Sequence, residues 1–342
     1  MEHKIQSQEK LLEVKDLAVS FDTYAGEVQA VRGVSWNLHK KETIAIVGES
    51  GCGKTVSIQT ILGLNPKKNT RIKSGEVLFE GEDLLKKSAK EMSHIQGDKM
   101  SIIFQDPFTY LNPTMTVGKQ ITEVYRKHRK VTRREAEEKM LDIMRMISFP
   151  NPEENMKRYP HQLSGGMRQR VMIAMGLICE PKILFADEPT TALDVTVQAQ
   201  IIDLMNSLKE KIDTSIVLIT HDMGVVANMA DRIYVMYAGK IVEHGDAASI
   251  FANPRHPYTK GLLSSVPRLD KKVDSELYSI PGTPPDLLAP PKGCAFAARC
   301  PYAMKICAKC QPEYTYFNEE DHYAACWLEE KERCMKMQGR EV

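Results

Sequence analysis

The run Gly48-Glu49-Ser50-Gly51-Cys52-Gly53-Lys54-Thr55 decides the fold of this 342-residue chain. It fits the phosphate-loop pattern G-x-x-x-x-G-K-[ST] at every fixed position. Residues 42–47 before it contain a short apolar run typical of a buried strand, and residues 56–64 after it are compatible with a helix. A strand, a glycine-rich loop and a helix in this order predict a site for a nucleoside triphosphate.

Each residue type in the loop has a physical task. Glycines let the backbone wrap around phosphate oxygens, and amide groups at the helix start face the anion. Lys54 adds a full charge for the β- and γ-phosphates, and the Thr55 hydroxyl is a ligand for Mg²⁺. The predicted nucleotide contacts in this stretch are Gly48, Ser50, Gly51, Cys52, Gly53, Lys54, Thr55 and Val56.

Composition narrows the class of protein. The net charge of +1 gives no general case for nucleic-acid binding. No apolar run approaches the roughly 18–20 residues that a membrane span needs, and the polar N-terminus lacks a signal-peptide core. We therefore expect a cytoplasmic chain that meets a membrane only through a partner. The last fifty residues carry six of the eight cysteines, namely Cys294, Cys300, Cys307, Cys310, Cys326 and Cys334.

The rest of the chain alternates between strand and helix patterns. Early strands are predicted at 11–14, 29–31 and 34–38, with a turn signal at Ala25-Gly26. The stretch 117–147 is helical, with Ala136, Met140, Ile143 and Met144 on its core face. Later elements are strands at 183–186, 216–219 and 233–236 and a helix at 195–212. This alternation predicts an α/β fold with a mainly parallel sheet and an inserted helical lobe.

Two carboxylates follow the apolar strand 183–186. Asp187 is placed to hold Mg²⁺, directly or through water, and Glu188 to polarise an attacking water as general base. A helix cap is the alternative interpretation of this acidic pair.

A second glycine motif stands about twenty residues earlier, in Leu163-Ser164-Gly165-Gly166-Met167-Arg168-Gln169-Arg170. Ser164 can cap the helix that follows, and Gly165 and Gly166 leave its amides open, which suits a γ-phosphate. This motif resembles the signature sequence of ATP-binding cassette (ABC) proteins.

The resemblance to the ABC family covers about residues 11–265, with a helical lobe at about 106–175. It implies a phosphate-loop fold with a mixed sheet, an antiparallel β subdomain and an inserted helical lobe. Gln105 matches the glutamine that contacts Mg²⁺ and the attacking water in this family. Asp194 belongs to a stretch that matches the loop at the dimer interface, and His221 matches the histidine that contacts the γ-phosphate. Phe21 or Tyr24 is expected to stack on adenine; alignment favours Phe21, and packing on the core is the alternative.

The resemblance also implies a partner, because in this family no single chain completes an ATP site. The phosphate loop of one subunit faces the signature of another, so Ser164, Gly165 and Gly166 would serve the nucleotide of the opposing subunit. The catalytic residues implied for this chain are Lys54, Gln105, Glu188 and His221.

The tail resembles the C-terminal extension of oligopeptide and dipeptide importer subunits. His256-Pro257-Tyr258-Thr259, Pro281-Gly282-Thr283-Pro284-Pro285 and Gly293-Cys294 carry that likeness, and a separate Cys-rich domain is expected at 266–342. The spacing C-x5-C-x6-C-x18-C of Cys294, Cys300, Cys307 and Cys326 suits zinc or an iron–sulfur cluster. In some members of this family the matching cysteines hold a [4Fe–4S] cluster. Zinc, no metal, and Cys310 as a substitute ligand are the alternatives.

The sequence therefore predicts the ATPase subunit of a di- or oligopeptide importer that uses ATP and Mg²⁺. The family implies a second and different ATPase subunit, two membrane-spanning permeases and an extracytoplasmic solute-binding protein as partners, without nucleic acid. The chain would lie peripherally on the cytoplasmic face of the cell membrane. Import of nickel or another small solute, and a soluble ABC ATPase outside transport, are the alternatives.

Overall fold

In the computed structural model, placement is described for residues 9–191, 193–265, 279–317 and 322–330. The chain forms two compact units, each assembled from several segments. We call the first the lobe unit; its segments are Met1–Leu11, Leu38–Thr43 and Leu84–Ile219. We call the second the loop unit; its segments are Leu12–Asn37, Ile44–Asp83 and Thr220–Val342.

Three parallel strands form the centre of the lobe unit: β6 (Met100–Ile103), β7 (Ile183–Asp187) and β8 (Ser215–Thr220). All residues of β7 and β8 are buried, as expected for parallel strands covered on both faces. The register pairs Ile103 with Ala186 and Asp187 with Ile219. The carboxyl ends of β6 and β7 therefore lie at one edge, where the chain continues into Gln105 and Glu188.

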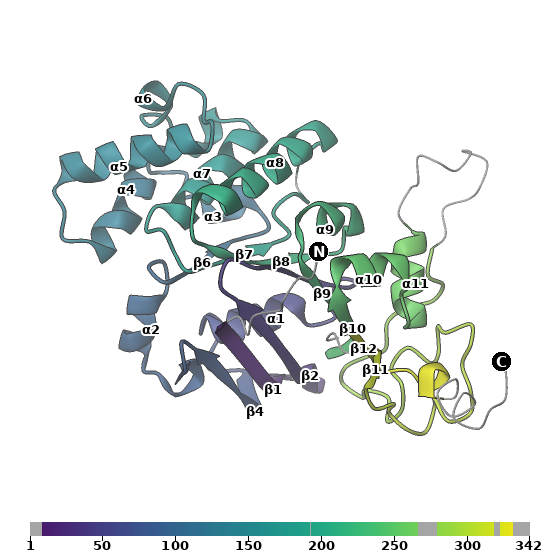
Figure 1. Cartoon of the computed structure of the whole chain (residues 1–342). Helices are drawn as coiled ribbons and strands as arrows, with labels where there is room; N and C mark the ends of the chain where they lie inside the picture. The colour runs from purple at the N-terminus through teal and green to yellow at the C-terminus, as the bar shows by residue number, and fades with distance from the viewer. Residues whose placement is uncertain (1–8, 192, 266–278, 318–321, 331–342) are drawn as a thin grey trace. The chain divides into compact units, whose positions relative to one another are not determined.

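Helices make up most of the remaining lobe unit, and α4 to α7 lie together in Figure 1. Helix α5 buries Ala136, Met140, Ile143 and Met144, which confirms the predicted core face. It begins with a capping box between Thr132 and Glu135. The helices of this unit are α2 (Ala89–Ile95), α3 (Pro107–Tyr110), α4 (Val117–His128), α5 (Arg133–Met146), α6 (Pro152–Asn155), α7 (Gly165–Leu177) and α8 (Val195–Lys211), with 3-10 turns η1 (Leu84–Lys86) and η2 (Pro160–Gln162).

An antiparallel sheet belongs to the loop unit, in the order β2-β1-β4-β5. Its strands are β1 (Lys10–Thr23), β2 (Gly26–His39), β4 (Thr70–Phe79) and β5 (Glu82–Asp83). The two strands predicted at 29–31 and 34–38 are one continuous strand, so that prediction was wrong. Gly33 adopts a φ of 79°, which lets the backbone pass through an irregular position without ending the strand.

The second sheet region of the loop unit supports the phosphate loop. Strand β3 (Thr43–Val47) pairs in parallel with β9 (Arg232–Tyr237), and helix α1 (Lys54–Ile61) follows the loop. Strand β9 pairs antiparallel with β10 (Lys240–Asp246), which pairs with β12 (His322–Ala324) and through it with β11 (Thr315–Phe317). The tail therefore adds the strands β11 and β12 to the sheet that contains β3, the strand before the phosphate loop.

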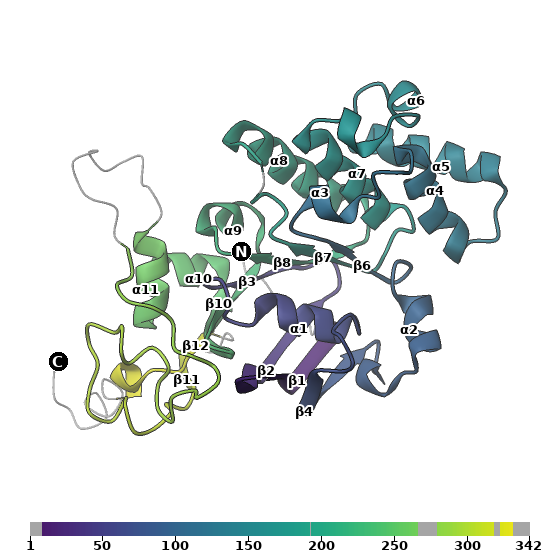
Figure 2. The same cartoon turned by 180° about the vertical axis from the view of Figure 1, so that it is seen from behind.

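The tail also shares the core of the loop unit. Phe296 packs with Val47, Val235, Tyr237 and Tyr258 in one buried cluster. Figures 1 and 2 show the yellow tail beside the green helices α10 and α11 from both sides. The helices of this part are α9 (Met223–Met229), α10 (Ala247–Ala252) and α11 (Pro257–Ser264). The predicted domain boundary at residue 266 lies outside the described residues. Within the described part of the chain, no helix is long and apolar enough to cross a membrane.

Candidate nucleotide site

The phosphate loop is packed so closely that two of its glycines have no room for a side chain. A Cβ atom at Gly48 would lie 2.1 Å from the carbonyl oxygen of Met236, and one at Gly53 would lie 2.3 Å from that of Ala30. Gly53 precedes helix α1 and offers no side chain to cap it, so the first amides of α1 remain available to an anion.

Lys54 reaches back across the loop. Its ammonium group donates to the carbonyl oxygens of Gly48 (2.6 Å) and Glu49 (3.0 Å), and the side chain is buried. Thr55 and Val56 are half-buried, whereas Ser50 and Gly51 are exposed. Burial raises the pKa of the Cys52 thiol, which disfavours the reactive thiolate. The structure thus gathers the predicted phosphate-contacting groups into one loop.

Two predicted catalytic side chains meet directly in the lobe unit. The Gln105 amide donates to the Glu188 carboxylate at 2.7 Å, and the Thr191 hydroxyl donates to the same oxygen at 3.1 Å. Glu188 has a φ of 45°, a conformation that costs on the order of 1–3 kcal/mol and is concentrated at functional sites. The next helix, α8, is capped by Asp194, so the acidic pair at 187–188 does not cap it.

The signature and the predicted interface loop are neighbours within the lobe unit. The Ser164 hydroxyl accepts a hydrogen bond from the Met167 amide at 3.4 Å and caps α7. Asp194 accepts one from the Val197 amide at 3.0 Å, and a Cβ at Gly166 would lie 2.7 Å from the side chain of Val197. Ser164 and Asp194 are both exposed. The two motifs therefore form one surface that a partner can reach.

Three predicted nucleotide contacts lie at element ends in the loop unit. His221 is exposed, and Asp222 after it caps α9 through the amides of Gly224 (2.7 Å) and Val225 (3.3 Å). Phe21 is half-buried near the end of β1, whereas Tyr24 is fully exposed at the turn. Stacking of either ring on adenine stays a prediction.

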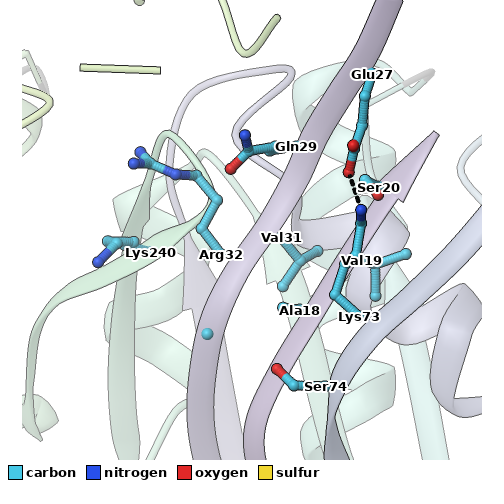
Figure 3. A pocket seen from close by; sticks show the side chains of 11 residues that line it. Ala18, Val19, Ser20, Glu27, Gln29, Val31, Arg32, Lys73, Ser74 and Lys240 are labelled. Atoms are coloured by element: carbon cyan, nitrogen blue, oxygen red, sulfur yellow. Dashed lines mark ion pairs between the residues drawn. The ribbon is translucent and has the colours of Figure 1, made fainter. Parts of the chain in front are cut away.

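A cavity of about 560 Å³ lies on the antiparallel sheet, and none of its lining residues is a predicted nucleotide contact (Figure 3). Arg32, Lys73 and Lys240 give its wall a basic character, and Glu27 pairs with Lys73 at 2.8 Å. The Arg32 guanidinium is committed to the carbonyl oxygens of Ala238 and Pro291. Arg32 and Lys73 of this wall are therefore engaged in internal contacts.

The cysteines of the tail gather but do not close around a metal. Burial raises the pKa of Cys294, Cys300 and Cys326, that of Cys326 to about 12, and neighbouring thiols of this group add to each shift. Among the residues with described placement, no group of three or more His, Cys, Asp or Glu has the arrangement of a metal site. Cys310 is exposed, and Cys334 lies outside the described residues.

Sequence patterns did not connect Arg299 with the phosphate loop. Its guanidinium forms a two-pronged ion pair with the Glu49 carboxylate, at 2.6 and 2.9 Å. Glu49 occupies a variable position of the loop motif, and the two residues are 250 positions apart. No local pattern can reveal a contact of that separation.

Comparison with known proteins agrees with this geometry. The ABC transporter family matches residues 31–191, and the oligopeptide/dipeptide transporter C-terminal region matches residues 242–307. The chain is 57% identical to the oligopeptide transport ATP-binding protein OppD of Bacillus subtilis, covering 93% of this chain and 89% of the relative. It is 55% identical to the dipeptide transport ATP-binding protein DppD of the same organism, covering 94% and 96%.

A solved structure supports the same assignment. The dimeric ATP-binding cassette MJ0796, in a post-hydrolysis state with ADP and phosphate, matches with a TM-score of 0.62 and 26% identity. The match covers 69% of this chain and 98% of that structure. The chain is therefore an ATPase of the ABC transporter family, and it carries the C-terminal region of the oligopeptide/dipeptide transporters.

Proposed function

We propose that this chain is the ATP-hydrolysing subunit of an importer for dipeptides or oligopeptides. The observation that carries this proposal is similarity over nearly the whole chain, tail included, to proteins named for oligopeptide and dipeptide transport. The subunit would sit peripherally at the cytoplasmic face of the cell membrane. Its partners would be two permease subunits, a second ATPase subunit and an extracytoplasmic solute-binding protein.

In the proposed mechanism the chain holds ATP and prepares a water molecule for attack on the γ-phosphate. The loop from Gly48 to Val56 binds the phosphates, with Lys54 as the charged contact. Thr55, Gln105 and Asp187 would hold Mg²⁺, which neutralises charge on the phosphates. Glu188 accepts the proton of the attacking water, and its hydrogen bond from Gln105 orients the carboxylate. His221 would contact the γ-phosphate.

The exposed motif surface of the lobe unit supports a requirement for a second subunit. Ser164, Gly165 and Gly166 form a capped helix start beside Asp194; Ser164 and Asp194 are exposed, and the two glycines are half-buried. A helix start of this kind binds anions. We assign this surface to the γ-phosphate held by the partner ATPase, which we expect to be a different chain.

We further propose that Cys294, Cys300, Cys307 and Cys326 hold a [4Fe–4S] cluster that stabilises the tail. Four thiols within electrostatic reach of one another are a suitable donor set, and their spacing supports the proposal. The described arrangement does not by itself form a metal site. Anaerobic purification with an absorption spectrum and metal analysis tests this proposal. A colourless protein with one zinc per chain, or without metal, would refute it.

The test of the catalytic assignment is Glu188→Gln in the full-length chain. We expect ATP turnover to fall by about 10²–10⁴-fold, the usual contribution of a general base, while the affinity for MgATP is retained. Glu138→Gln is the matched control, because Glu138 is an exposed acid paired with Arg134 on α5. Unchanged turnover in the Glu188 variant would remove this residue from the mechanism.

The test of the transported solute needs the assembled transporter. The chain would be co-expressed with candidate permeases and the second ATPase, and ATP turnover would be measured with the solute-binding protein. Stimulation by di- or oligopeptides is the expected result. Stimulation by nickel or another small solute alone would replace the peptide assignment, and no association with any permease would favour a function outside transport.

A further inference from the structure

Two residues of the C-terminal region, Tyr258 of α11 and Arg299, hold Glu49 of the phosphate loop by its main chain and its side chain. Its amide donates to the Tyr258 hydroxyl at 2.8 Å, and its carboxylate is gripped by Arg299 at 2.6 and 2.9 Å. Both partners lie in the region shared with oligopeptide and dipeptide transporters, residues 242–307. The loop unit therefore connects its family-specific region directly to its phosphate loop.

The Arg299 side chain is buried, and all three nitrogen atoms of its guanidinium group donate hydrogen bonds. Besides Glu49, its guanidinium donates to the carbonyl oxygens of Pro281 (3.0 Å) and Ile280 (3.2 Å) and to the Tyr237 hydroxyl (3.3 Å). The two hydrogen bonds to Glu49 make this a bidentate, charge-assisted contact. Two-pronged pairs of this kind fix geometry as well as charge, and removing Glu49 would leave the buried Arg299 charge uncompensated.

Tyr258 is equally well fixed. Its ring is fully buried and packs against Tyr237 and Phe296, with ring centroids 4.6 and 5.4 Å away. It stands in the first turn of α11, where the His256 ring accepts the Tyr258 amide at 3.1 Å. Burial raises the pKa of Tyr258, so its hydroxyl remains a neutral acceptor for the Glu49 amide.

Glu49 also contacts Lys54, the lysine of the phosphate loop. The carbonyl oxygen of Glu49 accepts from the Lys54 ammonium at 3.0 Å, and that of Gly48 accepts at 2.6 Å. Glu49 thus uses its amide toward Tyr258, its carboxylate toward Arg299 and its carbonyl toward Lys54. Any shift of Glu49 would move an acceptor that places the Lys54 charge.

We propose that Arg299 and Tyr258 are positioning residues for ATP, which hold Glu49 so that the loop and Lys54 are set for the phosphates before ATP arrives. This inference rests on the proposed nucleotide role of residues 48–55. It makes the tail a determinant of ATP affinity, in addition to any structural role. Because Arg299 directly precedes Cys300, the fold of the cysteine segment would also set the position of this guanidinium.

The test is the affinity of the full-length chain for MgATP, measured by titration calorimetry on variants whose folding is checked by circular dichroism. Arg299→Gln should raise the Kd about tenfold, because a charged and bidentate contact is lost. Arg299→Lys keeps the positive charge but loses the bidentate contact, and it should raise the Kd only about threefold. Tyr258→Phe removes one neutral hydrogen bond and should raise the Kd by a similar factor. The double variant Glu49→Gln/Arg299→Gln should be no weaker than Arg299→Gln alone, because both changes break the same pair.

A matched control and a second readout separate positioning from plain stabilisation. Arg133→Gln breaks an exposed pair on α5 and should leave the Kd unchanged. Amide hydrogen exchange of residues 48–55 should become faster in Arg299→Gln and Tyr258→Phe. Wild-type affinity in folded Arg299→Lys and Tyr258→Phe, with faster exchange confined to residues 279–300, would overturn the inference. Unchanged affinity in Lys54→Ala would instead overturn the nucleotide role of the loop itself.

Discussion

Two helix starts in this molecule present glycines and open amides, yet their surroundings differ sharply. At the start of α1, Lys54 is buried, and the loop before it is held by Tyr258 and Arg299. At the start of α7, Ser164 is exposed, and its cap is a local bond to Met167. The loop before the first helix start is held by residues of its own chain, whereas the second helix start is exposed at Ser164.

This difference fits our proposal that the start of α1 binds the ATP held by this chain, and the start of α7 the ATP held by the partner subunit. A preorganised loop with a buried lysine can bind a phosphate chain within one subunit, since the cost of ordering it has already been met in folding. The helix start at α7 is exposed at Ser164, as our proposal that it meets a phosphate held by another subunit requires. Changes at the loop should therefore act on ATP binding, and changes at the signature on turnover.

The largest expected effect on binding is at the loop. Lys54→Ala removes a buried charge that contacts two loop carbonyls, so the Kd for MgATP should rise about a hundredfold. Titration calorimetry on the full-length chain measures this. Lys67→Ala, at an exposed position in the turn between α1 and β4, is the control and should bind as the wild type does. Equal affinity in the two variants would break the contrast between the helix starts.

A smaller effect on turnover is expected within the lobe unit. Gln105→Ala removes the shorter of the two hydrogen bonds that Gln105 and Thr191 donate to the Glu188 carboxylate. Turnover should therefore fall about tenfold, while the affinity for MgATP stays within about twofold. Thr191→Val removes the longer bond and should cost less. Steady-state ATPase assays of both variants test this order, and a greater loss in Thr191→Val would contradict it.

The smallest effect concerns pH and the stability of the loop unit. Burial lowers the pKa of His244 to about 3, and its ring is neutral because it donates to the Ile233 carbonyl and accepts from Arg232. The unfolded chain takes up a proton at about pH 6.5. Stability is therefore complete above pH 6.5 and falls as the pH drops from 6.5 toward 3.

This pH effect is measurable as a slope. Urea unfolding of the wild type should lose up to about 1.4 kcal/mol per pH unit from His244 between pH 6 and 4. His244→Gln should flatten that slope by about one proton, while His256, whose burial lowers its pKa to about 4, keeps its own contribution. Identical slopes in the two proteins would show that His244 titrates normally.

Local patterns predicted the parts of this molecule that depend on neighbours in sequence. Periodicity identified the buried face of α5, and the strand-loop-helix order identified β3 and α1 around the phosphate loop. The prediction failed at β2, where two strands were expected at 29–31 and 34–38 and one continuous strand is found. Short late strands such as β11 and β12 were missed, because three residues give no usable periodicity.

The candidate site was likewise predictable only where motif order and local patterns determine the contacts. The meeting of Gln105 and Glu188 follows from parallel strands whose carboxyl ends share an edge, so motif order was enough. The contact between Glu49 and Arg299 joins positions 250 apart, and it exists only because the tail folds onto the core beside β9. Long-range packing decides such contacts, and one sequence does not encode them in any local pattern.

The most direct test of the contrast between the helix starts is a charge placed at Gly165, in the ATPase complex that contains this chain. A Cβ at Gly165 would have its nearest neighbours at 3.8 Å or more, so Gly165→Asp and the isosteric Gly165→Asn should both fold. With an anionic partner phosphate at this surface, Asp should reduce turnover about a hundredfold and Asn far less, with MgATP binding to this chain unchanged in both. Equal turnover in the two variants, or loss of MgATP binding by the isolated Asp variant, would contradict the account.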